Sequence, residues 1–549
     1  MISVNSVTVS FGGYNLFDNI SFLINPKDRI GLAGKNGAGK STMLKILSGN
    51  QNPTKGEVSM PKHCKIGYLP QDMIHQHGRT VFVETESAYE EIQNLEMRID
   101  EINHQLETRN DYESEAYGKL IEEQTEVYTR LDVLGASNRY EEIEKILKGL
   151  GFERKDFTRQ TAEFSGGWRM RIELAKLLLQ KPDILLLDEP TNGLDIETIG
   201  WLENFLADYE NIVLVVSHDR HFLDTVCTHV ADVDRSKIKV FTGNYTFWYE
   251  SSQLMSRQIN DKNKKNEEKR QALLDFIARF SANASKSKQA TSRKKALEKL
   301  TIEEIEPSNR KYPGIIFQPL REVGNQILNV ENLSKTVDGR KLFDKVSFSA
   351  NKGEKIAFLS KDPLAITSFF DIITENAPVE GGKYEWGTTI TKAYLPQENN
   401  EFFKEGLSLM DWLRQYVPAH VTDADEPFIR GFLGKMLFSG DDIQKKTNVL
   451  SGGEKVRCMV SRMMLQNPNV VILDQPTNHL DLESIQSFNE GCQTFPGIVF
   501  ITSHDHTFMQ TVANRIIELT PKGIIDRLMT FDEYMEDARV KELRAEMYA

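Results

Sequence analysis

The sequence has few cysteines and no long apolar segment. Its four cysteines are far apart and form no CxxC pair, which argues against a disulfide framework and against a zinc site. The longest apolar runs, such as Ile184–Leu187 and Ile212–Val216, fall far short of the roughly 20 residues that a membrane span needs. The N-terminus has neither the basic region nor the apolar region of a signal peptide. We therefore expect a soluble, cytoplasmic protein.

Positive charge is also scarce over most of the chain. The 67 Lys and Arg residues stand against 80 Asp and Glu residues, a formal net charge of −13, which is not typical of a general nucleic-acid coat. Residues 254–300 are the exception, because they hold 13 Lys and Arg against 5 Asp and Glu. A linker that is basic only to keep its helices soluble is one interpretation. Such sharp segregation in an acidic chain favours an anionic polymer as the partner.

The chain contains an internal repeat, and its 549 residues are enough for two or three domains. The motif YLPQ ends at Gln71 and again, 326 residues later, at Gln397. From the SGG motifs at Ser165 and Ser451 onward, the offset is 286 residues. The first half therefore carries 40 extra residues between Gln71 and Ser165, near residues 84–134.

These extra residues predict a helical arm. They are rich in Glu, Leu, Ile and Arg and contain almost no Gly or Pro. Apolar residues recur at helical spacing on both sides of a break at Asn110–Asp111, in one run with Leu95, Ile99, Ile102 and Leu106 and in a second run at Leu120–Leu131. Two antiparallel helices are expected from this pattern. A solvated surface hairpin is the alternative.

The first half contains the motif G-x-x-x-x-G-K-[ST] directly after the apolar strand Ile30–Ala33, and an apolar strand that ends in Asp follows later in each half. This order is typical of a doubly wound α/β domain. The glycines let backbone N–H groups turn toward phosphates, and the next helix adds its positive N-terminus. Lys40 is expected to reach the β- and γ-phosphates of ATP, and Ser41 to ligate Mg²⁺. The expected ATP-binding residues of this loop are Gly34, Lys35, Asn36, Gly37, Ala38, Gly39, Lys40, Ser41 and Thr42.

Four further polar residues fit the same chemistry. Asp188 ends an apolar strand and is expected to hold Mg²⁺ through water, and Glu189 beside it to polarise the attacking water. His218, after the next apolar strand, is expected to contact the γ-phosphate. Gln71 is expected to sense the metal and the water. Each of them alone is more often an ordinary surface or core residue, but their common register favours an ATP-hydrolysing site with Glu189 and His218 as its catalytic residues.

With the SGG motifs added, the chain resembles the ATP-binding cassette superfamily, whose P-loop NTPase domains carry an LSGGQ-like signature. Two cassettes on one chain, an arm in the first and a linker containing FIARFSANASKSKQATSRKKALEK resemble the ABC-F translation factors, most of all their YbiT-type branch. The resemblance implies an α/β fold with cassette 1 at 1–250, its helical arm at about 84–134, a basic helical-hairpin linker at 251–325 and cassette 2 at 326–549.

The resemblance also implies a function. ABC-F factors are ribosome-binding ATPases that enter the tRNA exit site and set the linker tip against peptidyl-tRNA, modulating elongation or rescuing stalled ribosomes. The implied partners are rRNA and peptidyl-tRNA, with no membrane subunit, and the chain is expected to be a monomer in which the two cassettes pair. The residues expected to contact RNA are Arg279, Lys286, Lys288, Arg293, Lys294 and Lys295.

The second phosphate loop, Ser360–Thr367, has lost most of its motif. Ile366 stands where the lysine should be, and Pro363 removes an N–H donor. Gln475, a poor base, replaces the glutamate that the first half has at Glu189. We expect one hydrolytic site, in cassette 1, and a second site that serves as a fixed or slowly changing hinge.

Cassettes of this superfamily pair head to tail, so that each phosphate loop faces the signature of the other half. The altered loop would face FSGGW at Phe164–Trp168, which departs from LSGGQ at both ends. Phe11, expected to stack on adenine, corresponds to Val337 in the second half. The signature residues expected to bind ATP at the intact loop are Ser451, Gly452, Gly453 and Glu454.

Three other functions were weighed. A transporter's nucleotide-binding subunit can contain two cassettes but has no use for a fused basic linker. A DNA-repair or chromosome ATPase usually has zinc-binding cysteines or very long coiled coils, which this sequence lacks. Antibiotic-resistance members of the ABC-F family often have a longer linker tip than residues 281–292, so a housekeeping or stress role is favoured.

Overall fold

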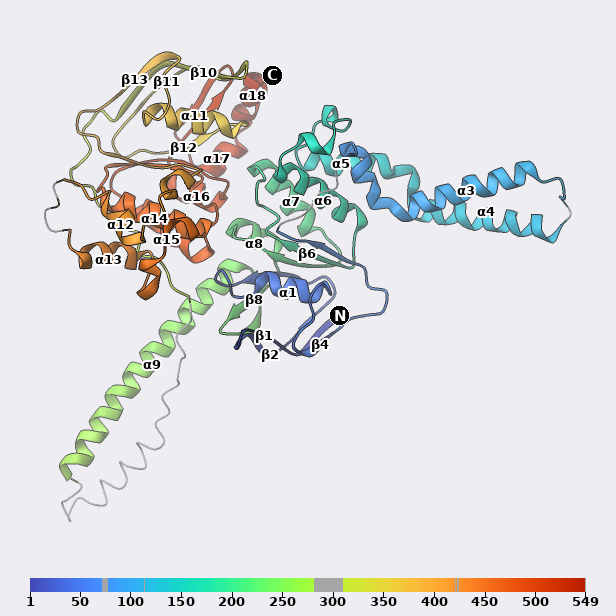
Figure 1. Cartoon of the computed structure of the whole chain (residues 1–549), viewed down its shortest axis with the longest axis horizontal. Helices are drawn as coiled ribbons and strands as arrows, with labels where there is room; N and C mark the ends of the chain where they lie inside the picture. The colour runs from blue at the N-terminus through green and yellow to red at the C-terminus, as the bar shows by residue number, and fades with distance from the viewer. Residues whose placement is uncertain (72–77, 113, 281–309, 420, 422–423, 549) are drawn as a thin grey trace.

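The computed structural model describes residues 1–71, 78–112, 114–280, 310–419, 421 and 424–548. Two halves of the same layout follow one another, and a long helix leaves the molecule between them (Figure 1). The strands of the first half are β1 (Ile2–Phe11), β2 (Tyr14–Ile24), β3 (Arg29–Ala33), β4 (Lys55–Ser59), β5 (Ile66–Leu69), β6 (Ile184–Asp188), β7 (Ile212–Val216), β8 (His229–Asp234) and β9 (Lys237–Thr242). Its helices are α1 (Lys40–Leu47), α2 (Val81–Glu86), α3 (Glu90–Thr108), α4 (Glu115–Val133), α5 (Arg139–Gly149), α6 (Gly166–Gln180), α7 (Ile196–Ala207), α8 (Arg220–Val226) and α9 (Tyr245–Phe280).

The second half repeats this order without the arm. Its strands are β10 (Leu328–Val337), β11 (Arg340–Ala350), β12 (Lys355–Leu359), β13 (Gly381–Trp386), β14 (Lys392–Leu395), β15 (Val470–Asp474), β16 (Ile498–Thr502), β17 (Arg515–Thr520) and β18 (Gly523–Arg527). Its helices are α11 (Pro363–Ile373), α12 (Leu409–Arg414), α13 (Glu426–Lys435), α14 (Gly452–Leu465), α15 (Leu482–Thr494), α16 (His506–Val512), α17 (Phe531–Glu536) and α18 (Ala538–Tyr548).

Each half is built on a six-stranded, mostly parallel sheet. The strand order is β5-β6-β7-β3-β8-β9 in the first half and β14-β15-β16-β12-β17-β18 in the second, and only the last strand of each sheet is antiparallel. A three-stranded antiparallel sheet completes each half, in the orders β2-β1-β4 and β11-β10-β13. Every residue of β6 and β7 is buried, as expected for parallel strands covered on both faces. The α/β prediction is confirmed, and the carboxyl ends of β3, β6 and β7 meet at one edge.

The extra residues of the first half form a helical arm. Helices α3 and α4 lie side by side and project away from both sheets (Figure 1). Ile99, Ile102, Leu120 and Val127 form a small apolar cluster of their own between the two helices. The prediction of two antiparallel helices is confirmed, because each helix buries its apolar stripe against the other.

The linker begins with α9, which starts inside the first half. Tyr245 and Trp248 are buried in the core of that half, and the helix then runs outward (Figure 1). The chain is next described at Arg310, and residues 310–327 contain no helix. The second helix expected in the linker hairpin falls at 281–309, outside the described residues. Neither α9 nor any other described helix is both long and apolar enough to cross a membrane.

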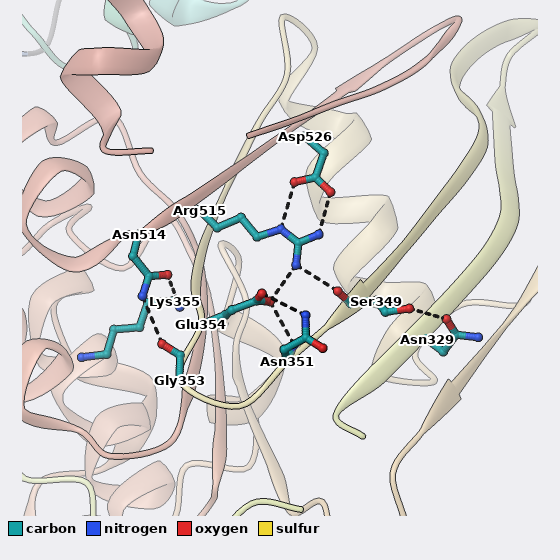
Figure 2. Close-up of polar contacts among 9 residues, drawn as sticks. All are labelled: Asn329, Ser349, Asn351, Gly353, Glu354, Lys355, Asn514, Arg515 and Asp526. Carbon is teal, nitrogen blue, oxygen red and sulfur yellow. Dashed lines mark hydrogen bonds and ion pairs between the residues drawn. The ribbon is translucent and has the colours of Figure 1, made fainter. Parts of the chain in front are cut away.

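A buried arginine ties the antiparallel sheet of the second half to its parallel sheet. The side chain of Arg515, at the start of β17, is only 9% exposed. Its guanidinium donates to both carboxylate oxygens of Asp526 in β18 at 2.9 and 2.6 Å (Figure 2). It also donates to Glu354 at 2.7 Å and to the carbonyl oxygen of Ser349 in β11 at 2.9 Å. Charge-assisted, bidentate contacts of this kind fix both distance and angle between the strands.

We expect Arg515→Met to destabilise the second half, because the substitution leaves Glu354 and Asp526 without their shared cation. Removing one partner of such a buried group costs about 3 kcal/mol, which lowers the melting temperature of a domain of this size by roughly 6–12 °C. Calorimetry measures the shift. Lys404→Met is the control, since this lysine is 69% exposed and pairs with an exposed Glu401. Equal melting temperatures for the two variants would contradict the role of Arg515.

Candidate nucleotide site

The two halves enclose a cavity of about 980 Å³ between the carboxyl edge of the first sheet and the start of α14. The first half contributes the phosphate loop, and the second half contributes its SGG motif. The two cassettes therefore face each other head to tail, as the resemblance to ATP-binding cassettes implies. The predicted site residues that line the cavity are Phe11, Asn36, Gly37, Gly39, Lys40, Ser41, Thr42, Gln71, Asp188, Glu189, His218, Ser451, Gly452, Gly453 and Glu454.

Three predicted loop residues do not line this cavity. The carbonyl oxygens of Gly34 and Lys35 instead accept hydrogen bonds from the Lys40 ammonium, at 2.6 and 3.3 Å. Ala38 packs against the apolar core beneath the loop. These residues shape the loop from behind. Of the predicted RNA contacts, the side chain of Arg279 and the residues Lys286, Lys288, Arg293, Lys294 and Lys295 lie outside the described part of the chain.

The phosphate loop depends on two left-handed glycines. Gly37 and Gly39 have φ values of 78° and 104°, which side chains disfavour. A Cβ atom at Gly39 would also lie 2.7 Å from the ring of Phe17. Gly39 is the N-cap of α1 and offers no side chain to its N–H groups. The positive end of α1 is thus available to an anion.

Glu189 is held in an uncommon backbone conformation at the end of β6. Its φ is 54°, a region that costs free energy for residues other than glycine. The backbone N–H of Glu189 donates to the carbonyl of Val216 at 2.8 Å, and the carboxylate accepts from the backbone N–H of His218 at 3.2 Å. This turn directs the carboxylate toward Lys40 and into the cavity.

Burial shifts the pKa values of Glu189 and His218 in opposite directions. It raises the pKa of the Glu189 carboxyl, against the attraction of Lys40, which lowers that pKa. Burial also lowers the pKa of His218 to about 3, so its imidazole is neutral at pH 7. The Nε2 atom of His218 lies 3.2 Å from the Glu189 carboxylate. A carboxylate with a raised pKa is a stronger base than one in water, as activation of a water molecule requires.

Asp188 and Ser41 are suited to hold a magnesium ion. The Ser41 hydroxyl is hydrogen-bonded to the Asp188 carboxylate. The other oxygen of Asp188, Oδ1, is buried and has no hydrogen-bond partner within the described ranges. Hydroxyl and carboxylate oxygens are the ligands that Mg²⁺ prefers. Burial raises the pKa of Asp188, so a bound cation would also relieve the cost of burying this charge.

Three residues that follow β15 in the second half, His479, Asp481 and Glu483, are not among the predicted site residues. His479 lies over the signature, because a Cβ atom on Gly452 would come within 3.1 Å of its ring. The charges of Asp481 and Glu483 also act on Lys40, where they raise its pKa against the lowering by burial. The 286-residue offset pairs His479 with Gly193, a difference between the halves that marks this segment in the sequence.

The corresponding loop of the second half is closed by its own residues. Asp362 is the N-cap of α11, its carboxylate accepts from the backbone N–H of Leu364 at 3.0 Å, and Pro363 follows it. A negative charge therefore lies at the helix end where phosphate would bind. The hydroxyl of Thr367 donates to Asp474 at 2.7 Å, which satisfies the carboxylate that would face the metal.

The second half nevertheless keeps the geometry of the base. Gln475 has a φ of 51°, and its side-chain oxygen accepts from the backbone N–H of His504 at 3.1 Å, as Glu189 does from His218. The uncharged amide replaces the carboxylate without moving the turn. The second half therefore lacks the charge of the catalytic base, although its backbone has the same conformation. For this reason we predict a single complete set of catalytic groups.

We expect Glu189→Gln to lower the rate of hydrolysis sharply, because it removes the carboxylate that the backbone N–H of His218 holds at the cavity. General-base removal lowers the rate constant by about 10²–10⁴, and steady-state phosphate release measures it. Gln475→Ala is the matched control in the second half and should leave the rate within about twofold of the parent, since an amide does little as a base. A comparable loss in both variants would show that both loops take part in the chemistry.

We also expect one ATP molecule per chain. Equilibrium dialysis of Glu189→Gln with radiolabelled ATP and Mg²⁺ measures the stoichiometry without turnover. Lys40→Met should remove this binding, because a buried apolar group would then face the phosphates. The matched substitution Ile366→Ala in the closed loop should leave the stoichiometry at one. Two bound nucleotides per chain would contradict the closure of that loop by Asp362.

Comparison with known proteins gives the same picture. Residues 17–192 and 343–478 match the family described as ABC transporter, and residues 231–317 match a second family with that description. The ABC transporter ATP-binding protein YkpA of Bacillus subtilis (strain 168) is 48% identical over 550 residues, covering 100% of both chains. The ATP-binding protein YbiT of Escherichia coli O157:H7 is 36% identical over 98% of this chain and 100% of its own length.

Two further similarities define the family and the fold. ABC transporter F family member 5 of Arabidopsis thaliana is 32% identical over 99% of this chain and 79% of its own length. The archaeal ribosome recycling factor aABCE1, solved in complex with the ribosomal stalk protein aP1, superimposes over 99% of both chains with a TM-score of 0.61 and 18% identity, a likeness of fold. With both cassettes matched and relatives aligned along nearly its full length, the chain is an ATPase that belongs to the ABC-F family of ATP-binding cassette proteins.

Proposed function

We propose that this protein is a cytoplasmic, ribosome-binding ATPase that enters the tRNA exit site and modulates elongation or rescues stalled ribosomes. Its partners are rRNA and peptidyl-tRNA. The observation that carries the proposal is the segregation of charge: residues 254–300 have a net charge of +8, while the rest of the chain is strongly acidic. Helix α9, where this segment starts, projects away from both cassettes (Figure 1). Phosphate backbones are the general partner of such a basic projection.

In this proposal the two cassettes bind the nucleotide and the linker binds RNA. Cassette 1 (1–250, with the arm at about 84–134) and cassette 2 (326–549) form one intramolecular pair around the nucleotide site. The linker (251–325) carries the RNA contacts. A ribosome recycling factor is among the proteins that share this fold, which supports a role at the ribosome.

In the proposed mechanism, ATP closes the two cassettes on each other. Phe11 stacks on the adenine, Lys40 and the α1 N-terminus bind the phosphates, and the SGG signature at Ser451–Gly453 completes the site from the other half. Since the signature contacts the γ-phosphate only in the closed arrangement, ATP has a higher affinity for that state and shifts the population toward it. Mg²⁺, held by Ser41, Gln71 and Asp188, neutralises phosphate charge when it is bound.

Hydrolysis then reverses the closure. The Glu189 carboxylate accepts the proton of the attacking water, and the neutral His218 lies beside it to orient the γ-phosphate. Loss of the γ-phosphate removes the contact between the nucleotide and the SGG signature of the other half, and the cassettes part. The second site, where Asp362 caps the helix end of the loop, serves as a fixed or slowly changing hinge in this proposal.

The test is co-sedimentation of Glu189→Gln with ribosomes, with and without ATP, at two salt concentrations. We expect retention that depends on ATP and falls steeply with salt, because phosphate contacts release counterions. Replacing Arg293, Lys294 and Lys295 together with Glu should abolish retention while ATP binding persists, and Lys404→Glu on the exposed surface of cassette 2 is the charge-matched control. Protein that stays at the top of the gradient in every condition would refute the proposal. Rescue of translation from a ribosome-targeting antibiotic would reassign it to drug protection.

A further inference from the structure

The returning end of the linker inserts an arginine between the two cassettes. One guanidinium nitrogen of Arg310 lies 2.6 Å from Asp232 in β8 of cassette 1, and the other lies 3.4 Å from Glu483 in α15 of cassette 2. The guanidinium also stacks 4.5 Å above the ring of Trp248, near the base of α9. The side chain is only 10% exposed. Arg310 therefore contacts cassette 1, including the base of α9 at Trp248, and cassette 2 at once.

The residues directly after Arg310 are anchored in cassette 2. The backbone N–H of Gly314 donates to the carbonyl of Lys435 at 2.7 Å. Ile315 and Phe317 are buried in the core of cassette 2. The four Cα–Cα steps from Arg310 to Gly314 can span at most about 14 Å when fully extended. This segment is a short strap between the cassettes, with Arg310 at one end and Gly314 at the other.

The strap lies on the same side as the working nucleotide site. Glu483 is the second residue of α15, whose N-cap is Asp481, and the charges of both residues act on Lys40. Glu483 is itself only 4% exposed, so without Arg310 its carboxylate would be buried with much less positive charge nearby. The ion pair of Arg310 with Glu483 therefore joins the strap to a carboxylate whose charge also acts on Lys40 of the phosphate loop.

A second arginine provides an internal comparison. Arg544 of α18 bonds Glu518 at 2.9 Å and Glu197 of cassette 1 at 2.9 Å. The 286-residue offset maps Asp232 onto Glu518 and Glu483 onto Glu197. The two arginines therefore bind acidic residues at equivalent positions of the two halves. Helix α18, however, packs on the core of cassette 2 through Val540, Leu543 and Met547. Arg544 therefore forms ion pairs across the interface, but it does not lie at the end of a short segment that links the two cassettes.

We propose that residues 310–314 are a strap that couples the linker to closure of the cassettes, with Arg310 as the positioning residue that fixes the strap when ATP closes the first nucleotide site. Parting of the cassettes stretches the short strap and withdraws Arg310 from one of its two carboxylates. The base of the linker then loses its ion pair with the cassette that carries this carboxylate. By thermodynamic linkage, a partner that holds the linker in place also raises the affinity for ATP.

The first test compares ATP with ADP in the Glu189→Gln full-length chain. Arg310→Gln should weaken ATP binding at least about tenfold, because closure then buries Glu483 without its partner. ADP, which lacks the γ-phosphate that meets the signature, should bind within about twofold of the parent, which also establishes that the variant is folded. Arg310→Lys should restore part of the ATP affinity. ATP affinity unchanged in Arg310→Gln would overturn the proposal.

The second test separates the strap from a simple ion pair. Spin labels at Asp261→Cys in α9 and Lys311→Cys in the strap, with Cys64→Ser to remove the one cysteine that is not buried, report the distance between the two linker legs. We expect one narrow distance with ATP, a broad distribution in Arg310→Gln at saturating ATP, and the narrow distance again in Arg544→Gln. Equal broadening in both arginine variants would reduce Arg310 to an ordinary interface contact. Neither test uses ribosomes, so the strap and the ribosomal role can fail independently.

Discussion

The uncapped positive end of α1 is the feature on which the nucleotide site depends. A helix N-terminus satisfies its free N–H groups with a side chain, with water or with a ligand. In cassette 1 the N-cap is Gly39, which offers nothing, and two left-handed glycines open the loop around it. In cassette 2 the N-cap is Asp362, which satisfies the helix itself. One scaffold thus gives an anion site in one half and a closed loop in the other.

The second cassette keeps the backbone geometry of the catalytic turn but lacks its negative charge. The turn that presents Glu189 recurs at Gln475, with the same left-handed backbone and the same hydrogen bond from the residue after the next strand. The SGG signature of the second half is present as well, but it faces the phosphate loop of the first half. Cassette 2 therefore has to keep its shape even though its own loop has lost the lysine, because the working site needs its SGG motif held in place.

Polar side chains make the contacts between the cassettes where the linker meets them. The side-chain amide of Gln486 in α15 donates to the hydroxyl of Tyr249 in α9 at 2.7 Å and contacts Arg220 of α8. Together with the contact of Arg310 with Glu483, these contacts place the base of both linker legs beside α15. Movement between the cassettes is therefore transmitted to the linker through hydrogen bonds and ion pairs, which form and break at lower cost than a packed apolar core.

The sequence alone determined the repeat, the α/β class, the arm and most of the nucleotide site, because each depends on local patterns: a glycine-rich loop after an apolar strand, an Asp-Glu pair at a strand end, apolar residues at helical spacing. It could not place Arg310, His479 or Glu483, which have no motif of their own. The roles of Arg310 and Glu483 arise from a contact between segments more than 150 residues apart, and that of His479 from its position over Gly452. Only the tertiary structure decided that Asp362 closes the second loop and that the strap crosses the interface, since both depend on where a side chain ends in space.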